Sequence, residues 1–348
     1  MLSHARLESL LRSFPRMTVA LVGDLFLDRY LELVPGSHEL SIETGLEAYQ
    51  IHRVRNSAGA LGTVMNNLAA LGVGMLLPVT VIGDDGHGFD LRQCLRSLPV
   101  DESHVLRDPR RLTPTYTKPM RLVDGQWREL NRLDVRTREP LDDAATVQLC
   151  QHLLAAFRQA DAVIVLDQIC EANCGVVNES IREFLRELTR REPHKLVFID
   201  SREFLGQFGC GVLKGNRGEV LLAADLAPTP EDDAFVERSL AQLASQTGRV
   251  AFCTLGERGI LVAEPNQAPT LVPGYPAKGP VDIVGAGDSA TSGIVLASLA
   301  GASPTEAAAV GNLVASITVQ QLGTTGVATP AQLLARHAEA TSSESSDP

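Results

Sequence analysis

The sequence contains no long run of basic residues and no apolar run long enough to cross a membrane. Its 31 Lys and Arg are outnumbered by 42 Asp and Glu, which gives a formal net charge of −11. A chain with this charge balance is not expected to bind nucleic acid or an anionic membrane surface. Because charged residues also interrupt the apolar N-terminal stretch, we expect neither secretion nor membrane insertion and predict a cytoplasmic protein.

The six cysteines are scattered through 348 residues, and only Cys170 and Cys174 lie close together in the sequence. This distribution predicts reduced, buried thiols. A pair spaced by four residues could form half of a metal site, but no second pair and no histidine stands at a matching spacing. We therefore expect no cysteine-bound metal.

Short β-rich runs alternate with helical patterns along the chain, which is 44% apolar and can bury a large core. Buried strands are predicted at residues 18–22, 76–82, 162–166, 196–199 and 250–254, and helices at 61–71, 150–158 and 177–189. The segment Ser303-Pro304-Thr305-Glu306 forms a capping box, which predicts a helix from there to Gly323. The alternation predicts an α/β fold with a mostly parallel sheet.

Two stretches interrupt this alternation. Residues 31–54 and 113–134 are interrupted by charges and lack helical periodicity, so we expect them to form separate β-structure. The core would then comprise residues 1–30, 55–112 and 135–338. Residues 339–348 are rich in Ser and Glu with almost nothing apolar, which predicts a disordered tail.

Residues 281–296 place an aspartate inside a glycine-rich turn that opens a helix. Gly285 and Gly287 can adopt backbone angles that other residues avoid, and the unpaired N–H groups of the first helical turn then favour an anion such as phosphate. A carboxylate in the same turn would repel a resting phosphate. Asp288 is therefore best explained as a base that takes a proton from a hydroxyl attacking that phosphate, which predicts phosphoryl transfer to an alcohol.

Two other interpretations of this turn stay open. Residues 285–290 also fit the loose G-x-G-x-x-A pattern of dinucleotide-binding folds, although too little chain follows them to complete such a unit. A purely structural glycine-rich turn with an aspartate near the helix N-terminus is the second alternative.

Residues 282–288, which read D-I-V-G-A-G-D, resemble the C-terminal motif of the ribokinase-like (PfkB) carbohydrate kinases. The resemblance extends from about Thr18 to Leu334. Residues 83–88, 216–219 and 254–259 are similar to three further family motifs, and residues 22–30, 113–121 and 131–134 are most similar to the heptose-phosphate kinase branch. The resemblance implies a ribokinase-like mostly parallel sheet flanked by helices, with the two β-rich insertions forming a small lid over a sugar.

The resemblance also implies roles for the phosphoryl-transfer and nucleotide residues. Asp288 would be the base, while the turn of Gly285, Ala286, Gly287 and Asp288 would form the anion hole. Asn216 and Glu219 would hold Mg²⁺ through water. Contacts with ATP would come from four further residues: Thr254, Gly256, Gly259 and Asn312. Asp282, with carbonyls near Gly323, occupies a position that binds a monovalent cation such as K⁺ in many relatives.

For the sugar, the resemblance points to Asp24 and Asp28, which we expect in one turn after a buried strand, and to Asp167 at the carboxyl edge of the sheet. Gly59 and Thr63 stand in the sugar loop, where relatives carry a second glycine and an asparagine and this chain has Ala60 and Thr63. Charges in the β-rich insertions, Lys118, Arg121 and Arg132, favour an acceptor that already carries phosphate. The heptose-phosphate branch usually carries the motifs D-Y-x-K-G and D-P-K, each with a lysine. Residues 167–171 and 200–202 of this chain read D-Q-I-C-E and D-S-R, so both lysines are missing.

Two functional classes remain open at this point. The first is an ATP-dependent carbohydrate kinase that phosphorylates a sugar or a sugar phosphate. The second is a non-catalytic sugar- or nucleotide-binding regulator on the same fold, but such a protein has no need of the base Asp288. The exposed edges of the β-rich insertions also predict a homodimer formed through the lid.

Overall fold

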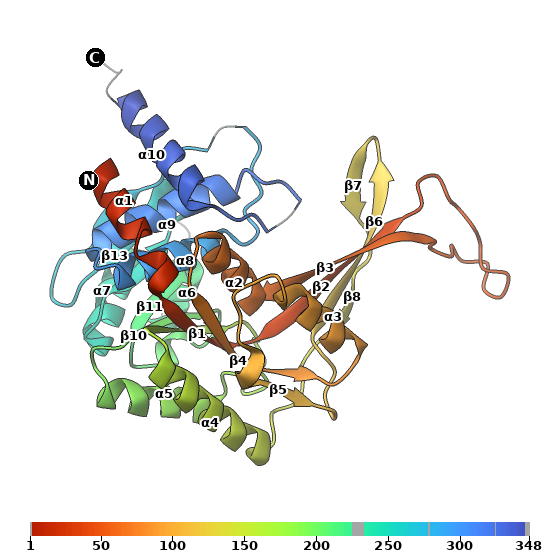
Figure 1. The fold of residues 1–348 in the computed structure, drawn as a ribbon, viewed down its shortest axis with the longest axis horizontal. Helices are drawn as coiled ribbons and strands as arrows, with labels where there is room; N and C mark the ends of the chain where they lie inside the picture. Colours follow the sequence, from red (N-terminus) through yellow and green to blue (C-terminus); the bar gives the residue numbers. More distant parts are fainter. Residues whose placement is uncertain (1, 225–232, 278, 324, 345–348) are drawn as a thin grey trace.

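The computed structural model describes residues 2–224, 233–277, 279–323 and 325–344. Its main element is a nine-stranded sheet with the order β14-β13-β12-β11-β10-β9-β1-β4-β5 (Figure 1). Neighbouring strands pair in parallel, except that β13 is antiparallel to both of its neighbours, β12 and β14. Their bounds are β1 (Thr18–Gly23), β4 (Met75–Gly83), β5 (Val105–Asp108), β9 (Ala162–Asp167), β10 (Leu196–Ser201), β11 (Val212–Asn216), β12 (Ala251–Thr254), β13 (Gly259–Ala263) and β14 (Thr270–Pro273).

Helices cover both faces of this sheet. On one face lie α1 (His4–Leu11), α2 (Leu61–Ala70), α3 (Gly86–Leu95), α8 (Ala286–Leu299), α9 (Pro304–Thr318) and α10 (Pro330–Glu344). On the other lie α4 (Asp143–Gln159), α5 (Glu179–Arg191), α6 (Arg217–Ala223) and α7 (Asp233–Thr247). Alternate residues of β1 enter opposite cores, since Val19 and Leu21 pack on one face and Ala20 and Val22 on the other. Burial on both faces explains the continuous apolar runs of the strands and confirms the mostly parallel α/β sheet.

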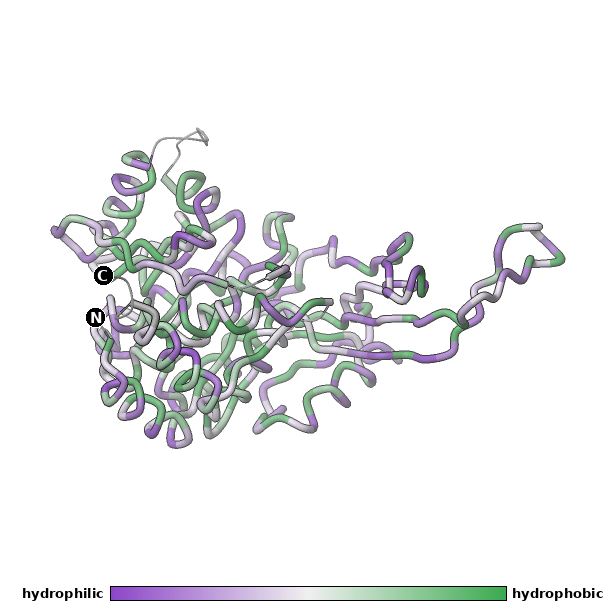
Figure 2. Tube along the Cα trace, turned by 90° about the horizontal axis from the view of Figure 1, so that it is seen from above, coloured by the Kyte–Doolittle hydropathy of each residue, from purple (hydrophilic) through white to green (hydrophobic). Residues whose placement is uncertain are grey.

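A second, smaller sheet projects from this core as a narrow arm (Figures 1 and 2). It contains β2 (Leu25–Leu33), β3 (Ile51–Ala60), β6 (Thr115–Val123), β7 (Gln126–Glu129) and β8 (Leu133–Val135). We call it the lid sheet. It begins earlier than expected from residues 31–54, because the first half of β2 is apolar and buried at the junction and so resembles a core strand.

Two expectations at the chain's second half need correction. Helix α9 begins at Pro304 with the expected capping box but ends at Thr318 rather than Gly323. Residues 339–344 belong to α10 and are not disordered, while residues 345–348 lie outside the described residues. The helix is held because His337 contacts the Leu2 carbonyl oxygen through Nε2 at 2.9 Å and Arg336 donates to the carbonyl of Pro276. Anchoring contacts of this kind are invisible in the local composition.

The prediction of reduced, buried thiols is confirmed only in part. All six cysteines are free, but only Cys174, Cys210 and Cys253 are buried, and Cys170 is exposed. Within the described ranges, no three His, Cys, Asp or Glu side chains are grouped as a metal site. No helix in the same ranges has the length and apolar character needed to cross a bilayer.

Candidate active site

The glycine-rich turn lies at the N-terminus of α8, beside the carboxyl ends of the central strands. Gly285 has a left-handed backbone (φ 79°, ψ 3°) that favours glycine, and the helix begins at Ala286. The N–H of Ala286, which the resemblance placed in the anion hole, donates to the carbonyl of Ile283 at 3.1 Å and is therefore engaged inside the turn. The N–H groups of Gly287 and Asp288 have no acceptor within the described part of the chain and can receive an anion.

The side chain of Asp288 is half-buried in the first turn of α8. Burial and the nearby charge of Asp200 raise the pKa of Asp288 to about 7, against the opposing effect of Lys214 and Arg202. A general base works best when its pKa lies near the operating pH. The protonation behaviour of Asp288 therefore suits proton abstraction from an alcohol.

A buried ion pair lies directly beneath this turn. Nζ of Lys214 is 2.7 Å from Oδ2 of Asp200, and the two residues are register partners on neighbouring strands β11 and β10. The same carboxylate oxygen accepts a hydrogen bond from Oγ1 of Thr291 at 3.2 Å. We did not identify Lys214 from the sequence. The available signal was a charged residue near the carboxyl end of each of two adjacent buried strands.

Thr63, which we expect in a sugar loop, lies against the same turn. Its Cγ2 would be 3.4 Å from a Cβ placed on Gly285. The lid sheet adds Asp28 on β2, whose Oδ1 pairs with Nζ of Lys118 on β6 at 2.9 Å. Burial lowers the pKa of Lys118, but Asp28 and Tyr30 raise it by more, so the pKa lies above its ordinary value. Gly59 lies opposite this pair, since a Cβ on it would come within 2.2 Å of Oδ2 of Asp28.

Arg121 does not join this group. Successive strand residues point to opposite faces of a sheet, so Arg121 lies on the other face of β6 from Lys118. Its Nη2 donates to Oε1 of Glu47 at 2.6 Å. The expectation that Lys118 and Arg121 act together on one substrate is therefore wrong, because their odd spacing on a strand separates them.

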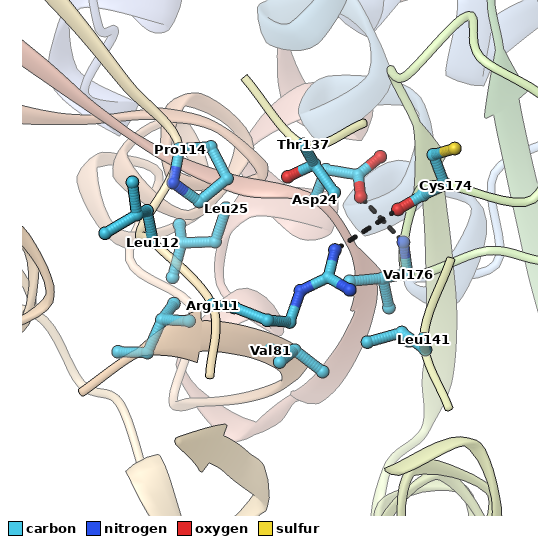
Figure 3. A pocket seen from close by; sticks show the side chains of 11 residues that line it. Asp24, Leu25, Val81, Arg111, Leu112, Pro114, Thr137, Leu141, Cys174 and Val176 are labelled. Carbon is cyan, nitrogen blue, oxygen red and sulfur yellow. Dashed lines mark hydrogen bonds between the residues drawn. The ribbon is translucent and has the colours of Figure 1, made fainter. Parts of the chain in front are cut away.

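Asp24 follows β1 directly, as predicted, but Asp28 lies within β2, so the two aspartates do not share one turn. The Asp24 carboxylate accepts backbone N–H groups from Val176 at 2.8 Å and Gln168 at 3.1 Å. It borders a cavity of about 10 Å³, which can hold no more than one water molecule (Figure 3). This geometry gives Asp24 a structural role in joining β1 to the loop after β9.

Asp167 is buried at the carboxyl end of β9. Oγ of Ser201 donates to its Oδ2 at 2.9 Å. Burial, together with the charge of Asp24, raises the pKa of Asp167 to about 7. Asp167 thus lies at the predicted edge of the sheet, next to strand β10 that carries Asp200.

On the other side of the turn, Asn216 and Glu219 form a capping box at the start of α6. Oδ1 of Asn216 accepts the N–H of Glu219 at 3.0 Å, and Oε2 of Glu219 accepts the N–H of Asn216 at 2.7 Å. Burial and Asp200 raise the pKa of Glu219. The box leaves the second carboxylate oxygen of Glu219 and the amide nitrogen of Asn216 for other contacts.

The remaining residues that we expect near the nucleotide lie around β12, β13 and α9. Thr254 ends β12, and Gly256 (φ 62°) and Gly259 (φ 106°) shape the following turn. A Cβ on Gly259 would lie 2.2 Å from the Val272 carbonyl oxygen, so only glycine fits there. Asn312 on α9 donates through Nδ2 to the carbonyls of Val272 at 3.0 Å and Pro273 at 3.1 Å, which ties α9 to β14.

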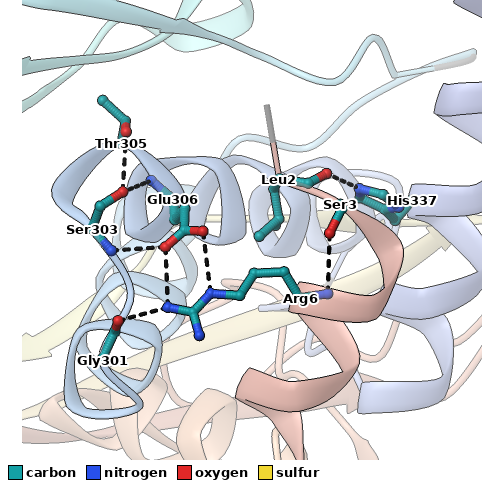
Figure 4. Close-up of polar contacts among 8 residues, drawn as sticks. All are labelled: Leu2, Ser3, Arg6, Gly301, Ser303, Thr305, Glu306 and His337. Carbon is teal, nitrogen blue, oxygen red and sulfur yellow. Dashed lines mark hydrogen bonds and ion pairs between the residues drawn. The ribbon is translucent and has the colours of Figure 1, made fainter.

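Helix α9 is fixed at its N-terminus as well. Arg6 on α1 donates through Nε and Nη2 to the two carboxylate oxygens of Glu306, both at 3.2 Å, and through Nη2 to the Gly301 carbonyl at 2.7 Å (Figure 4). Glu306 also completes the capping box with Ser303. These contacts fix the helix that packs against α8, which begins at the glycine-rich turn.

Asp282 connects the turn to the chain after α9. Its Oδ1 accepts the N–H of Val284 at 3.1 Å, and its Oδ2 accepts the N–H of Gly323 at 3.1 Å. Both oxygens therefore already serve a structural purpose. A monovalent cation at Asp282 stays a prediction.

Residues 19–332 match the pfkB family carbohydrate kinases. The chain is 32% identical over 335 residues to the bifunctional protein HldE of Caulobacter vibrioides, covering 94% of this chain and 65% of that protein. It is 30% identical over 318 residues to HldE of Caulobacter sp., covering 91% and 62%. It thus spans less than two thirds of the length of these curated relatives.

Solved structures show the same fold. The Arabidopsis thaliana ribokinase complexed with ribose and ATP has a TM-score of 0.68 at 18% identity, covering 92% of this chain and 98% of that one. The Escherichia coli phosphofructokinase-2 in complex with substrates and products has a TM-score of 0.70 at 16% identity, covering 93% and 99%. These likenesses confirm a ribokinase-like α/β fold with a second, smaller sheet.

Proposed function

Because this chain belongs to the pfkB family of carbohydrate kinases, we propose that it transfers the γ-phosphoryl group of ATP to a sugar hydroxyl with Asp288 as the base. The observation that carries this proposal is the combination at the N-terminus of α8. A carboxylate with a pKa raised to about 7 lies in the same turn as two N–H groups open to an anion. A base and an anion site side by side are what phosphoryl transfer to an alcohol requires.

In the proposed reaction, Asp288 takes the proton of the acceptor hydroxyl as its oxygen forms a bond to the γ-phosphorus. The bond from that phosphorus to the bridging oxygen breaks, and the electron pair leaves with ADP. The N–H groups of Gly287 and Asp288 stabilise negative charge on the moving phosphoryl group. Lys214 adds a positive charge beneath them, since its Nζ lies 3.0 Å from the place of a Cβ on Gly287.

ATP reaches such enzymes with Mg²⁺, and the donors here suit that ion. Mg²⁺ prefers oxygen ligands and keeps several waters, so one carboxylate and one amide can hold it through water. We propose Glu219 and Asn216 for this purpose, because their capping box leaves one carboxylate oxygen unused. When bound, the ion would neutralise phosphate charge. Thr254, Gly256 and Gly259 would border the nucleotide.

The acceptor is proposed as a sugar or sugar phosphate bound between Thr63 and the lid-sheet residues Asp28 and Gly59. Lys118 is paired with Asp28, and Arg132 with Asp134 at 2.8 Å, so neither is a free phosphate ligand. Arg121 lies on the other face of the lid sheet. The charges that favoured a phosphorylated acceptor are therefore largely neutralised, which puts a free sugar on an equal footing with a sugar phosphate.

We also propose a homodimer formed through the lid sheet and its connecting residues 34–50. These segments expose a series of apolar side chains: Val34, Leu40, Ile42, Leu46, Tyr49, Ile51, Val54, Trp127 and Leu133. Apolar surface of this extent on a projecting sheet is typical of an interface.

A non-catalytic sugar- or nucleotide-binding regulator is the second candidate, favoured by the altered sugar loop at Ala60 and Thr63. ADP formation measured against a panel of free and phosphorylated sugars separates the two. The kinase proposal expects turnover with at least one sugar, and expects Asp288→Asn to lower kcat by about 10² or more while ATP affinity stays the same. An Asp288→Asn enzyme with unaltered kcat would contradict the assignment of the base.

A further inference from the structure

Beneath the catalytic turn lies an ion pair between Asp200 and Lys214, and each of these residues is only 4% exposed. A buried ion pair is weak evidence for stability, because removing two charges from water offsets most of their attraction. Neighbouring strand positions in this sheet are filled by apolar residues, such as Ile199 and Leu213. An ion pair between Asp200 and Lys214 at this place in the sheet therefore calls for a role other than holding the strands together.

The pair contacts α8 on both sides of Asp288. One position before Asp288, the missing side chain of Gly287 leaves room for Nζ of Lys214, which would lie 3.0 Å from a Cβ there. One turn after Asp288, Oγ1 of Thr291 donates to Oδ2 of Asp200 at 3.2 Å. Residues three apart lie on the same side of a helix, so Thr291 and Asp288 face the pair together. The geometry places one positive and one negative charge under the proposed base.

We propose that Lys214 and Asp200 are positioning residues that control the charge of Asp288 in opposite directions and together set the pH below which the enzyme loses activity. This inference rests on the proposed function of Asp288 as the base. Lys214 favours the carboxylate form by attraction, and Asp200 opposes it by repulsion. Both act through a buried medium, where charges are screened far less than at the surface.

The other ionisable groups around Asp288 are less able to set its charge. Arg202, which follows β10, is exposed, so water and salt screen its effect. Glu219 on α6 is half-buried, and one of its oxygens is engaged with the N–H of Asn216. The pKa of Asp288 responds to all four groups in addition to burial. Only Asp200 and Lys214 are both buried and in contact with α8.

The test is the pH dependence of kcat/KM in variants of the full-length protein. Lys214→Met should move the acid-side midpoint to higher pH, because the carboxylate loses an attracting charge. Asp200→Asn should move it to lower pH, because the carboxylate loses a repelling charge. We expect each single shift to be about one pH unit. The double variant should return close to the original midpoint.

A purely structural pair predicts a different result, since breaking it from either side would lower activity at all pH values without moving the midpoint. Lys195→Met is the matched control. Lys195 is a half-buried lysine that donates to the carbonyls of Phe157 at 3.0 Å and Ala160 at 2.6 Å, next to the amino end of β10 and away from the catalytic turn. Its loss should leave the midpoint unchanged. Lys214→Gln replaces Lys214→Met if the apolar side chain prevents folding.

A second readout does not depend on activity. The carboxyl ¹³C resonance of Asp288, assigned by its disappearance in Asp288→Asn, should titrate with the same opposite shifts in the two single variants. Shifts in the same direction, or no shift in either variant, would overturn the inference even if Asp288 is the base. If Asp288→Asn keeps full turnover, the proposed function fails instead, and the resonance still reports whether the pair controls that carboxyl group.

Discussion

A Cβ on Gly59 would lie 2.2 Å from Oδ2 of Asp28, so the carboxylate of Asp28 occupies the space that any larger residue at position 59 would need. In the pairing of β2 with β3, Gly59 lies opposite Phe26 and Asp28 lies opposite Ser57, so Gly59 and Asp28 are diagonal neighbours on adjacent strands. The absence of a side chain at 59 thus lets Asp28 pair with Lys118 next to the proposed sugar site. Any larger residue at position 59 would therefore disturb the pair of Asp28 and Lys118.

Gly59→Ala should displace the Asp28 carboxylate and raise KM for the sugar at least about tenfold, equivalent to about 1.4 kcal/mol of binding. KM for ATP should stay the same, because the residues proposed to border the nucleotide lie on the other side of the turn. Steady-state kinetics with each substrate varied separately measures both. Gly86→Ala is the matched control, since a Cβ on Gly86 meets no atom within 4 Å. Equal effects of the two variants would argue against Asp28 as a sugar ligand.

The raised pKa of Asp288 also affects folding stability. The side chain has an ordinary pKa of 3.8 and a folded pKa of about 7, so its ionisation opposes folding. The destabilisation is absent below pH 4, grows between pH 4 and 7, and is complete above pH 7. Asp288→Asn should therefore raise the free energy of unfolding at pH 8 by about 2 kcal/mol, discounted for partial solvent contact, and have little effect at pH 4.

Urea unfolding at the two pH values measures this difference. Asp143→Asn, at the exposed start of α4, serves as the control and should show no comparable gain at pH 8. A stabilisation by Asp288→Asn of the same size at pH 4 and pH 8 would mean that ionisation of Asp288 is not its cause.

Ala60 has a backbone conformation that disfavours side chains. Its φ of 52° and ψ of −113° lie where glycine is preferred, at the junction between β3 and α2. Such a conformation costs about 1–3 kcal/mol for a residue other than glycine, while glycine adds about 0.5–1 kcal/mol of unfolded-state entropy. Ala60→Gly should therefore stabilise the protein by about 1 kcal/mol in urea unfolding. Ala58→Gly, in the ordinary part of the same strand, should destabilise it; the same sign for both variants would contradict strain at Ala60.

The sequence was sufficient for the elements that depend on local pattern. The apolar runs that became β1, β4, β9, β10 and β12 are buried on both faces, and the capping box at Ser303 marks a real helix start. The left-handed turn at Gly285 that opens α8 also follows from its glycines, which adopt backbone angles that other residues avoid. These features are encoded within a few residues of one another.

Features that depend on contacts between distant segments could not be predicted in this way. Asp200 and Lys214 become partners only through the register of two parallel strands. The opposite directions of Lys118 and Arg121 follow from strand alternation, once residues 115–123 are known to form one strand. Asp24 looked like a sugar ligand, but the N–H groups that it accepts come from residues 168 and 176, far along the chain.

The separation of the two lid cations gives a paired prediction. Lys118→Met should raise KM for the sugar about tenfold or more, because it leaves Asp28 without the partner that orients its carboxylate. Arg121→Met should leave that KM within about twofold, since Arg121 binds Glu47 on the other face. Initial rates with varied sugar at saturating ATP provide the measurement. A larger effect of Arg121→Met would show that the acceptor reaches the face that carries Glu47.

The proposed dimer can be tested by the mass of the protein in solution and by variants that should disrupt the interface. Val54 on β3 is 44% exposed, and Ile42, in the segment between β2 and β3, is fully exposed. A charge at either position would have to be buried in an interface through the lid sheet, which is unfavourable without a partner. Light scattering at micromolar concentration should give about twice the 37.3 kDa mass of one chain.

Val54→Glu and Ile42→Glu should shift the protein toward the single-chain mass, whereas Val147→Glu, on the exposed face of α4, should not. A single-chain mass for the unaltered protein would rule out the dimer at that concentration, and an equal response to all three variants would place the interface elsewhere.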